Sequence, residues 1–208
     1  NAMRASLLLS VLFLVIGAVN LSDSRMDEEV IVSIGIWIVA IFLLISYEGV
    51  RGSNGLKHRG LTGNAAIAAA IGMDVLFGAS AVSGTTNPKV ISLAVIAFFY
   101  SLARELIKDI EDMEGDIDRN TVPRSIGVES ARSIAWIFTM AAFIVLFLPF
   151  ILEVFPTGHA ILVAPGGLLL MLVKSKLFIG EDRAAQRLIK RSLQISMIGV
   201  IASAIIIG

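Results

Sequence analysis

The sequence contains no cysteine, only two histidines, and few charged residues, which make up 16% of the chain. Without cysteine, the chain can form no disulfide and can use no thiolate as a nucleophile or metal ligand. The two histidines, His58 and His159, fall on opposite sides of the membrane in the topology derived below, so we expect no metal site shared between them. The 17 basic and 17 acidic residues cancel, which argues against a nucleic-acid partner or a polybasic membrane anchor.

Hydrophobic residues dominate what is present, at 56% of the chain with a mean hydropathy of +0.86. One soluble core could not bury that much apolar surface, so the surrounding solvent must be lipid. A helix needs roughly 20 mostly apolar residues to cross a bilayer core, and membrane barrel strands are much shorter. We therefore expect an all-α, polytopic transmembrane bundle, with residues 1–208 forming a single domain. The spans lie near 4–21, 29–47, 61–83, 89–108, 129–152, 159–178 and 185–207.

The segments between these spans alternate in charge. Every Lys and Arg except Arg25 and Lys89 lies in one alternating set, which comprises the N-terminal residues and segments 48–60, 104–132 and 174–191. Membrane proteins retain positive charge on the cytoplasmic side. The pattern predicts a multi-pass protein of the cell membrane whose large, charged loops face the cytoplasm.

The span 61–83 is rich in Gly and Ala and carries an ionisable residue, Asp74. Asp74 follows Asn64 by ten residues, or roughly 15 Å along a helix, which places it well inside the membrane. A carboxyl group at that depth must face protein or water and is a candidate for function. A hydrogen-bonded packing role is an equally good interpretation.

An acidic segment at the end of span 89–108 is the most informative stretch, with seven acidic residues in positions 105–118. Four of them, Glu105, Asp109, Asp112 and Asp116, fall on one face of a helix, although Gly115 could end that helix before Asp116. Grouped carboxylates suit Mg²⁺, whose coordination shell is usually completed by water and substrate phosphates. The alternative is a solvated acidic loop paired with nearby cations, namely Lys108, Arg119 and Arg124.

Two motifs resemble a known family. Residues 108–116 (KDIEDMEGD), followed by 121–127 (TVPRSIG), resemble the second aspartate-rich motif of the UbiA superfamily of membrane prenyltransferases, in the form found in its archaeal ether-lipid branch. Residues 56–64 (LKHRGLTGN) are similar to the short basic segment that precedes the family's fifth helix. The order of the spans agrees with the family over the whole chain.

The resemblance implies a nine-helix bundle with a central cavity in which two facing aspartate motifs bind Mg²⁺ and a polyprenyl diphosphate. The seven spans resemble helices three to nine, so the first two helices and the first motif are not found in this sequence. Asp23 and Asp27 have the spacing of that motif, but the charge pattern places them on the outer side.

The family's chemistry also implies roles for individual residues. Asp109, Asp112 and Asp116 would bind the metal, while Lys57, Arg59 and Lys108 would contact phosphate oxygens. Asn64 and Tyr47 would line the cavity mouth, and Asp74 is a further candidate for substrate binding.

The resemblance implies transfer of a geranylgeranyl-type group to a lipid precursor, with geranylgeranylglyceryl phosphate as the expected acceptor. An aromatic acceptor from quinone or haem synthesis is an alternative that keeps the same chemistry. A small membrane transporter and an inactive fragment that retains only the fold are alternatives of other classes. Against the transporter, the sequence has no evident internal repeat or pair of broken helices.

Overall fold

A computed structural model describes residues 11, 12, 15, 26–49, 55–80, 85–115 and 119–207 of the chain. The described part is helical and contains no strand. Its long helices are α2 (Met26–Glu48), α3 (Leu61–Ser80), α4 (Pro88–Glu111), α6 (Val128–Ile151), α7 (Ala160–Phe178) and α8 (Asp182–Ile207). Short helices η1 (Leu56–His58), α5 (Val122–Ile126) and η2 (Thr157–His159) lie in the connections.

The long helices confirm the expected helical membrane bundle. Six helices of the described part are long and apolar enough to cross a membrane, and each corresponds to one of the predicted spans. The predicted span 4–21 lies almost entirely outside the described residues. Helix α4 continues to Glu111, beyond the expected end of its span at residue 108, so Asp109 belongs to the helix. The chain is therefore a multi-pass membrane protein.

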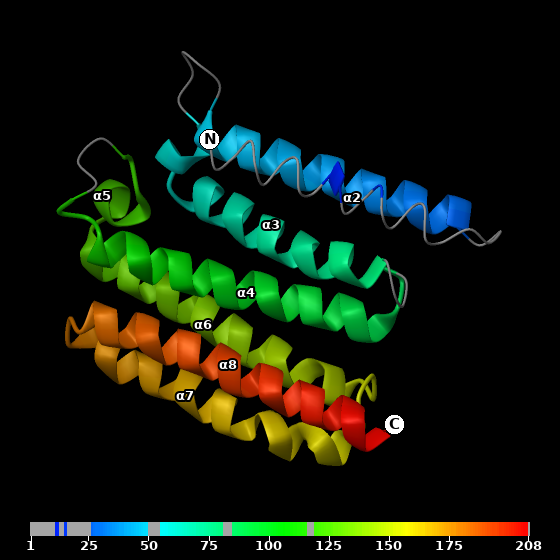
Figure 1. Ribbon diagram of the computed structural model, residues 1–208. Coiled ribbons are helices and arrows are strands. Elements are labelled where there is room, and N and C mark those ends of the chain that lie inside the picture. The colour runs from blue at the N-terminus through cyan, green and yellow to red at the C-terminus, as the bar shows by residue number, and fades with distance from the viewer. Residues whose placement is uncertain are drawn as a thin grey trace.

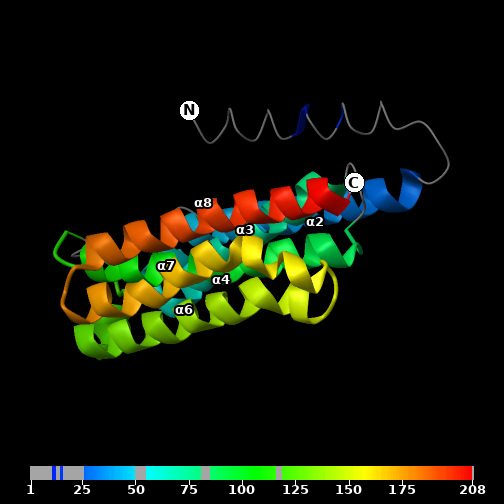
Figure 2. The same cartoon turned by 90° about the horizontal axis from the view of Figure 1, so that it is seen from below.

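Helix α4 lies at the centre of the bundle (Figure 1). It contacts α3, α6 and α8, while α7 packs against both α6 and α8, so that α4, α6, α7 and α8 form a closed group of four. Seen from below, α6 lies on the far side of α4 from α8 (Figure 2). Helix α2 packs against α3 at the edge of the bundle and carries mostly exposed apolar side chains, as expected for a helix in contact with lipid.

Local sequence explains where α4 and α6 begin. The Asn87 side chain accepts a hydrogen bond from the backbone N–H of Lys89 at 3.0 Å, and Pro88 occupies the first turn, where its missing N–H costs nothing. Helices α5 and α6 are separated only by Gly127, whose φ of 87° is readily adopted by glycine.

Small residues allow α7 and α8 to pack closely. The carbonyl of Gly166 accepts a hydrogen bond from Ser192 Oγ at 2.7 Å, and the Ser192 hydroxyl also lies 2.8 Å from the buried Tyr100 hydroxyl of α4. A side chain at Gly166 would collide with Ser196. Close backbone approach and buried hydroxyl contacts are the usual means of holding helices together in lipid.

This packing predicts that Gly166→Val lowers the free energy of unfolding by about 1–3 kcal/mol, because the added atoms must push α8 away from α7. Gly78→Val is the matched control, since an added Cβ at Gly78 meets nothing within 4 Å. Thermal unfolding in detergent measures both variants. Equal destabilisation by the two substitutions would contradict close α7–α8 contact at Gly166.

Candidate substrate and metal site

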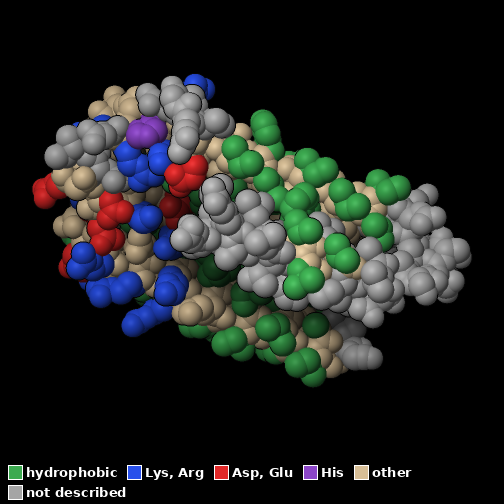
Figure 3. All heavy atoms as spheres, turned by 45° about the horizontal axis from the view of Figure 1, so that its top comes forward, with side chains coloured by type: hydrophobic (Ala, Val, Ile, Leu, Met, Phe, Trp, Pro, Cys, Tyr) green, Lys and Arg blue, Asp and Glu red, His purple; other side chains and the backbone are tan. Residues whose placement is uncertain are grey.

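Charged side chains gather at one end of the bundle, and hydrophobic side chains are spread over the coloured surface beyond it (Figure 3). This end contains η1, the C-terminal end of α4, helix α5 and the α7–α8 turn. Several predicted site residues lie on the elements that meet here, namely η1, the start of α3 and the end of α4.

The centre of the candidate site is a contact between α3 and α4. Asn64 is buried, with 8% exposure, and its Nδ2 donates a hydrogen bond to Asp109 Oδ2 at 2.8 Å. The two residues are 45 positions apart in the sequence and come from the two different motifs. The amide donates to the carboxylate and thereby fixes its direction.

Glycines let the basic segment pack against its neighbours. An added Cβ at Gly63, the residue before Asn64, would lie 3.3 Å from the Lys57 Cα atom. Gly60 has a φ of 51°, and its added Cβ would lie 3.3 Å from the Asn120 carbonyl oxygen. The segment that carries Lys57 is thus held against the start of α3 and against the connection between α4 and α5.

Tyr47 and the two lysines of the predicted site all have protein partners. Tyr47, in the last turn of α2, accepts a hydrogen bond from Arg119 Nη2 at 3.0 Å. Lys57 Nζ lies 2.8 Å from Glu48 Oε2, and Lys108 Nζ lies 3.9 Å from Glu105 Oε2. Both lysines thus lie beside a carboxylate at the charged end.

Arg59 differs from these lysines. It follows η1 directly and is exposed, and its side chain makes no hydrogen bond or ion pair with any residue in the described ranges. A guanidinium offers several fixed donors and suits phosphate recognition. Arg59 is therefore the cation of the predicted set most available to a ligand.

The acidic face is shorter than expected. Helix α4 ends at Glu111, and Asp112 is its C-cap, with a backbone N–H that still bonds to the Lys108 carbonyl at 2.8 Å. The next residues form a turn in which the Gly115 N–H bonds to the Asp112 carbonyl at 3.0 Å. We expected that Gly115 could end the helix, and this expectation is wrong: the helix already ends at Glu111, before the turn that contains Gly115. Asp116 lies outside the described residues.

The donor set fits part of a magnesium site. Among the residues that the structure describes, no three His, Cys, Asp or Glu side chains come close enough to bind a metal together. Mg²⁺ is commonly bound by only one or two carboxylates, together with water and substrate phosphates. Asp109 and Asp112 lie three residues apart at the end of α4, so their number and type are compatible with such a site.

Asp74 is not brought together with these residues. It lies ten residues beyond Asn64 on α3 and is exposed, with no hydrogen bond or ion pair to any other residue in the described part. A role for Asp74 in substrate binding stays a prediction.

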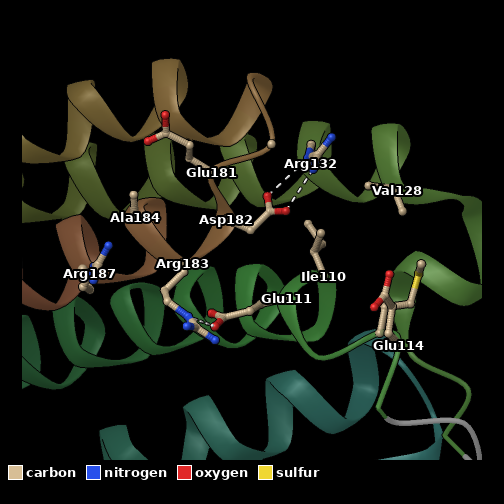
Figure 4. Close-up of a pocket in the computed structure, with 12 residues that line it drawn as sticks. Ile110, Glu111, Glu114, Val128, Arg132, Glu181, Asp182, Arg183, Ala184 and Arg187 are labelled. Atoms are coloured by element: carbon tan, nitrogen blue, oxygen red, sulfur yellow. Dashed lines mark hydrogen bonds and ion pairs between the residues drawn. The ribbon is translucent and has the colours of Figure 1, made fainter.

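A second charged region lies on the other face of the α4 end and was not predicted as a site. An open pocket of about 600 Å³ is lined there by residues of the end of α4 and the turn after it, of α6, of the α7–α8 turn and of the start of α8 (Figure 4). Arg183 Nε donates to Glu111 Oε1 at 2.7 Å, and Arg132 Nη2 donates to Asp182 Oδ2 at 2.9 Å. One feature of the sequence could have indicated this second region, because Glu111 does not lie on the helical face that carries Asp109.

Comparison with known proteins gives a family match over nearly the whole chain. The profile of the UbiA prenyltransferase family matches residues 1–198. Similar proteins include the digeranylgeranylglyceryl phosphate synthase of Haloquadratum walsbyi, 29% identical over 86% of this chain and 59% of the relative. The synthases of the same name from Halobacterium salinarum and Archaeoglobus fulgidus are 33% and 32% identical, over 65% and 69% of this chain and 49% and 50% of the relatives.

The chain spans about half the length of these curated relatives. No solved structure matches the chain. The family match agrees with the resemblance carried by the two motifs, and it favours an enzyme of this family over a transporter.

The contact between Asn64 and Asp109 predicts a measurable coupling energy. In a double-mutant cycle of Asn64→Ala and Asp109→Ala, we expect a coupling of about 1.5–3 kcal/mol, as is typical of a hydrogen bond to a charged group. Unfolding of the four proteins in detergent provides the measurement. The control cycle pairs Asn64→Ala with Glu114→Ala, an exposed residue of the same acidic segment, and should give no coupling. Equal coupling in both cycles would argue against a direct contact.

Proposed function

Because the chain belongs to the UbiA prenyltransferase family, we propose that it transfers a geranylgeranyl-type group from its diphosphate to geranylgeranylglyceryl phosphate in ether-lipid synthesis. The names of the archaeal relatives support this choice of acceptor. The observation that carries the proposal is the contact between Asn64 and Asp109, which joins the basic and acidic motifs at one end of the bundle.

In this reaction the C1–O bond of the allylic diphosphate breaks, and the diphosphate leaves with the electron pair. The acceptor hydroxyl oxygen forms the new bond to C1 and releases its proton. Mg²⁺ bound by Asp109 and Asp112 would supply positive charge that neutralises the leaving diphosphate. Asp116 would add a third carboxylate to this set.

The other residues have supporting roles in the proposal. Asn64 is a positioning residue, because it holds the Asp109 carboxylate in place. Arg59, Lys57 and Lys108 contact diphosphate or acceptor phosphate oxygens through charge-assisted hydrogen bonds. Tyr47 borders the mouth of the site, and Asp74 contacts substrate at greater depth. The apolar helices keep water away from the allylic cation, which water would otherwise capture.

The proposal predicts that Asp109→Asn and Asp112→Asn each lower prenyl transfer by at least about 100-fold, because each removes a carboxylate that would hold the Mg²⁺ needed to neutralise the leaving diphosphate. Glu114→Gln removes a charge of the same sign from the same segment, and it should retain activity within about twofold. The assay uses the whole native protein in lipid with labelled geranylgeranyl diphosphate and Mg²⁺. Isothermal titration with Mg²⁺ and the diphosphate measures binding separately.

Parallel reactions identify the acceptor. Geranylgeranylglyceryl phosphate and 4-hydroxybenzoate are offered under the same conditions, and we expect label only in the lipid product. Transfer to the aromatic acid alone would contradict the proposed lipid acceptor but not the proposed prenyl donor. Transfer to neither acceptor would count against the enzymatic function itself.

The charge asymmetry further supports a cytoplasmic location for the charged end. Because the chain has no cysteine, single cysteines can report its orientation without background. Glu181→Cys in the α7–α8 turn should react with a membrane-impermeant maleimide only in inside-out vesicles. Gly158→Cys, in the connection before α7, should react only in right-side-out vesicles, and the reverse pattern would invert the topology.

A further inference from the structure

The two proposed metal ligands differ in how their side chains are held. The Asp109 carboxylate accepts a hydrogen bond from Asn64 Nδ2 at 2.8 Å, which fixes its direction. The Asp112 side chain makes no hydrogen bond or ion pair with any residue that the structure describes. The direction of the Asp112 carboxylate therefore depends on the backbone that carries it.

The backbone of Asp112 lies where α4 ends and a turn begins. The Asp112 N–H donates to the Lys108 carbonyl at 2.8 Å, and the Asp112 carbonyl accepts from the Gly115 N–H at 3.0 Å. The last carbonyls of a helix have no partner within the helix. A side chain from another element that binds a carbonyl in this turn can therefore fix the position of the turn.

Arg124 of α5 makes such a contact. Its Nη2 donates to the carbonyl oxygen of Met113, the residue after Asp112, at 2.7 Å. A charged donor makes a shorter and stronger hydrogen bond than a neutral one, and a cation near a helix C-terminus is favoured by the helix dipole. Arg124 was expected to pair with carboxylates if the acidic segment were only a solvated loop, but it binds a backbone carbonyl.

Helix α5 is held in place by buried residues. Thr121, Val122 and Pro123 at its start are buried, and α5 packs against both α4 and α6. The Arg124 side chain is exposed, so its removal leaves no cavity in the core. Arg124 thus joins a packed segment of the bundle to the turn that follows Asp112.

We propose that Arg124 is a positioning residue, which holds the turn after α4 through the Met113 carbonyl and thereby directs the Asp112 carboxylate toward the metal. Arg124 itself touches neither the metal nor the diphosphate. This inference rests on the proposed function, because it requires that Asp112 binds Mg²⁺.

Arg124 has two physical effects on Mg²⁺ binding, and they have opposite signs. A cation close to Asp112 repels a divalent metal, so loss of its charge alone would strengthen Mg²⁺ binding. Loss of the hydrogen bond to Met113 releases the turn, which weakens Mg²⁺ binding. The direction of the change in Mg²⁺ affinity therefore separates a positioning role from a purely electrostatic one.

The test is a titration of Mg²⁺ into the whole native protein in lipid, with a non-reactive thio-analogue of geranylgeranyl diphosphate present. R124Q should weaken Mg²⁺ binding by at least about fivefold, because groups that orient a metal ligand strongly affect metal affinity. The matched control is R183Q, which removes the same charge from the other face of the α4 end, where Arg183 binds the Glu111 side chain. R183Q should not weaken Mg²⁺ binding.

The prenyl-transfer assay provides a second readout. R124Q should raise the Mg²⁺ concentration needed for half-maximal transfer, while kcat at saturating Mg²⁺ stays within about threefold of the wild type. A merely structural role would lower kcat and leave the Mg²⁺ dependence unchanged. Thermal unfolding of R124Q in detergent should match that of the wild type.

A double-mutant cycle with D112N separates failure of this inference from failure of the proposed function. D112N should weaken Mg²⁺ binding, and R124Q should add no further loss in the D112N background, because Arg124 acts through Asp112. A further loss would show that Arg124 contacts the ligand directly and would overturn the positioning role.

The remaining outcomes are equally distinct. If D112N weakens Mg²⁺ binding but R124Q leaves it unchanged or makes it tighter, the inference is wrong and the proposed function stands. Equal weakening by R124Q and R183Q would likewise overturn the inference. Equal Mg²⁺ binding by the wild type and D112N would overturn the proposed role of Asp112 and this inference with it.

Discussion

A peptide group in hydrocarbon must find its hydrogen-bond partner inside the protein, and the organisation of this chain depends on that constraint. The described spans meet it by forming helices. Hydroxyl side chains likewise pair across helices, as Ser33 does with Ser80 at 2.7 Å and Tyr100 with Ser192. Most charges are thereby confined to the helix ends and connections. The chemistry proposed here occurs at an end of the bundle because the carboxylates and most of the cations can gather there.

Because α3 and α4 pack antiparallel, residues that are far apart in the sequence come into contact. The start of α3 meets the end of α4, which brings Asn64 to Asp109. The same end of α4 directs Glu111 to the opposite side, where Arg183 of α8 binds it. The end of α4 therefore contacts the candidate site on one face and α8 on the other.

The spans could be predicted from the sequence because about 20 consecutive apolar residues have few other interpretations in lipid. Helix α5 was not predicted, since five residues are too few to show a helical periodicity. The exact end of α4 was not predicted either, because the turn that follows it is closed by a single backbone hydrogen bond at Gly115. The acidic segment was recognisable from charge alone. Asn64 was predicted as a site residue only from the resemblance to the family. An amide in an apolar segment does not by itself indicate which carboxylate it will contact. The pairing of Glu111 with Arg183 spans 72 residues and follows only from the packing of α8 on α4.

The central claim is that a prenyl diphosphate binds at the end of α4 that carries Asp109 and Asp112. An experimental structure of the native protein with Mg²⁺ and a non-reactive thio-analogue of geranylgeranyl diphosphate tests it most directly. The account predicts the diphosphate within coordination distance of a metal bound by these two carboxylates, with Arg59 close to its oxygens. A diphosphate located in the pocket of Glu111 and Arg183, with no metal bound by Asp109 and Asp112, would contradict the account.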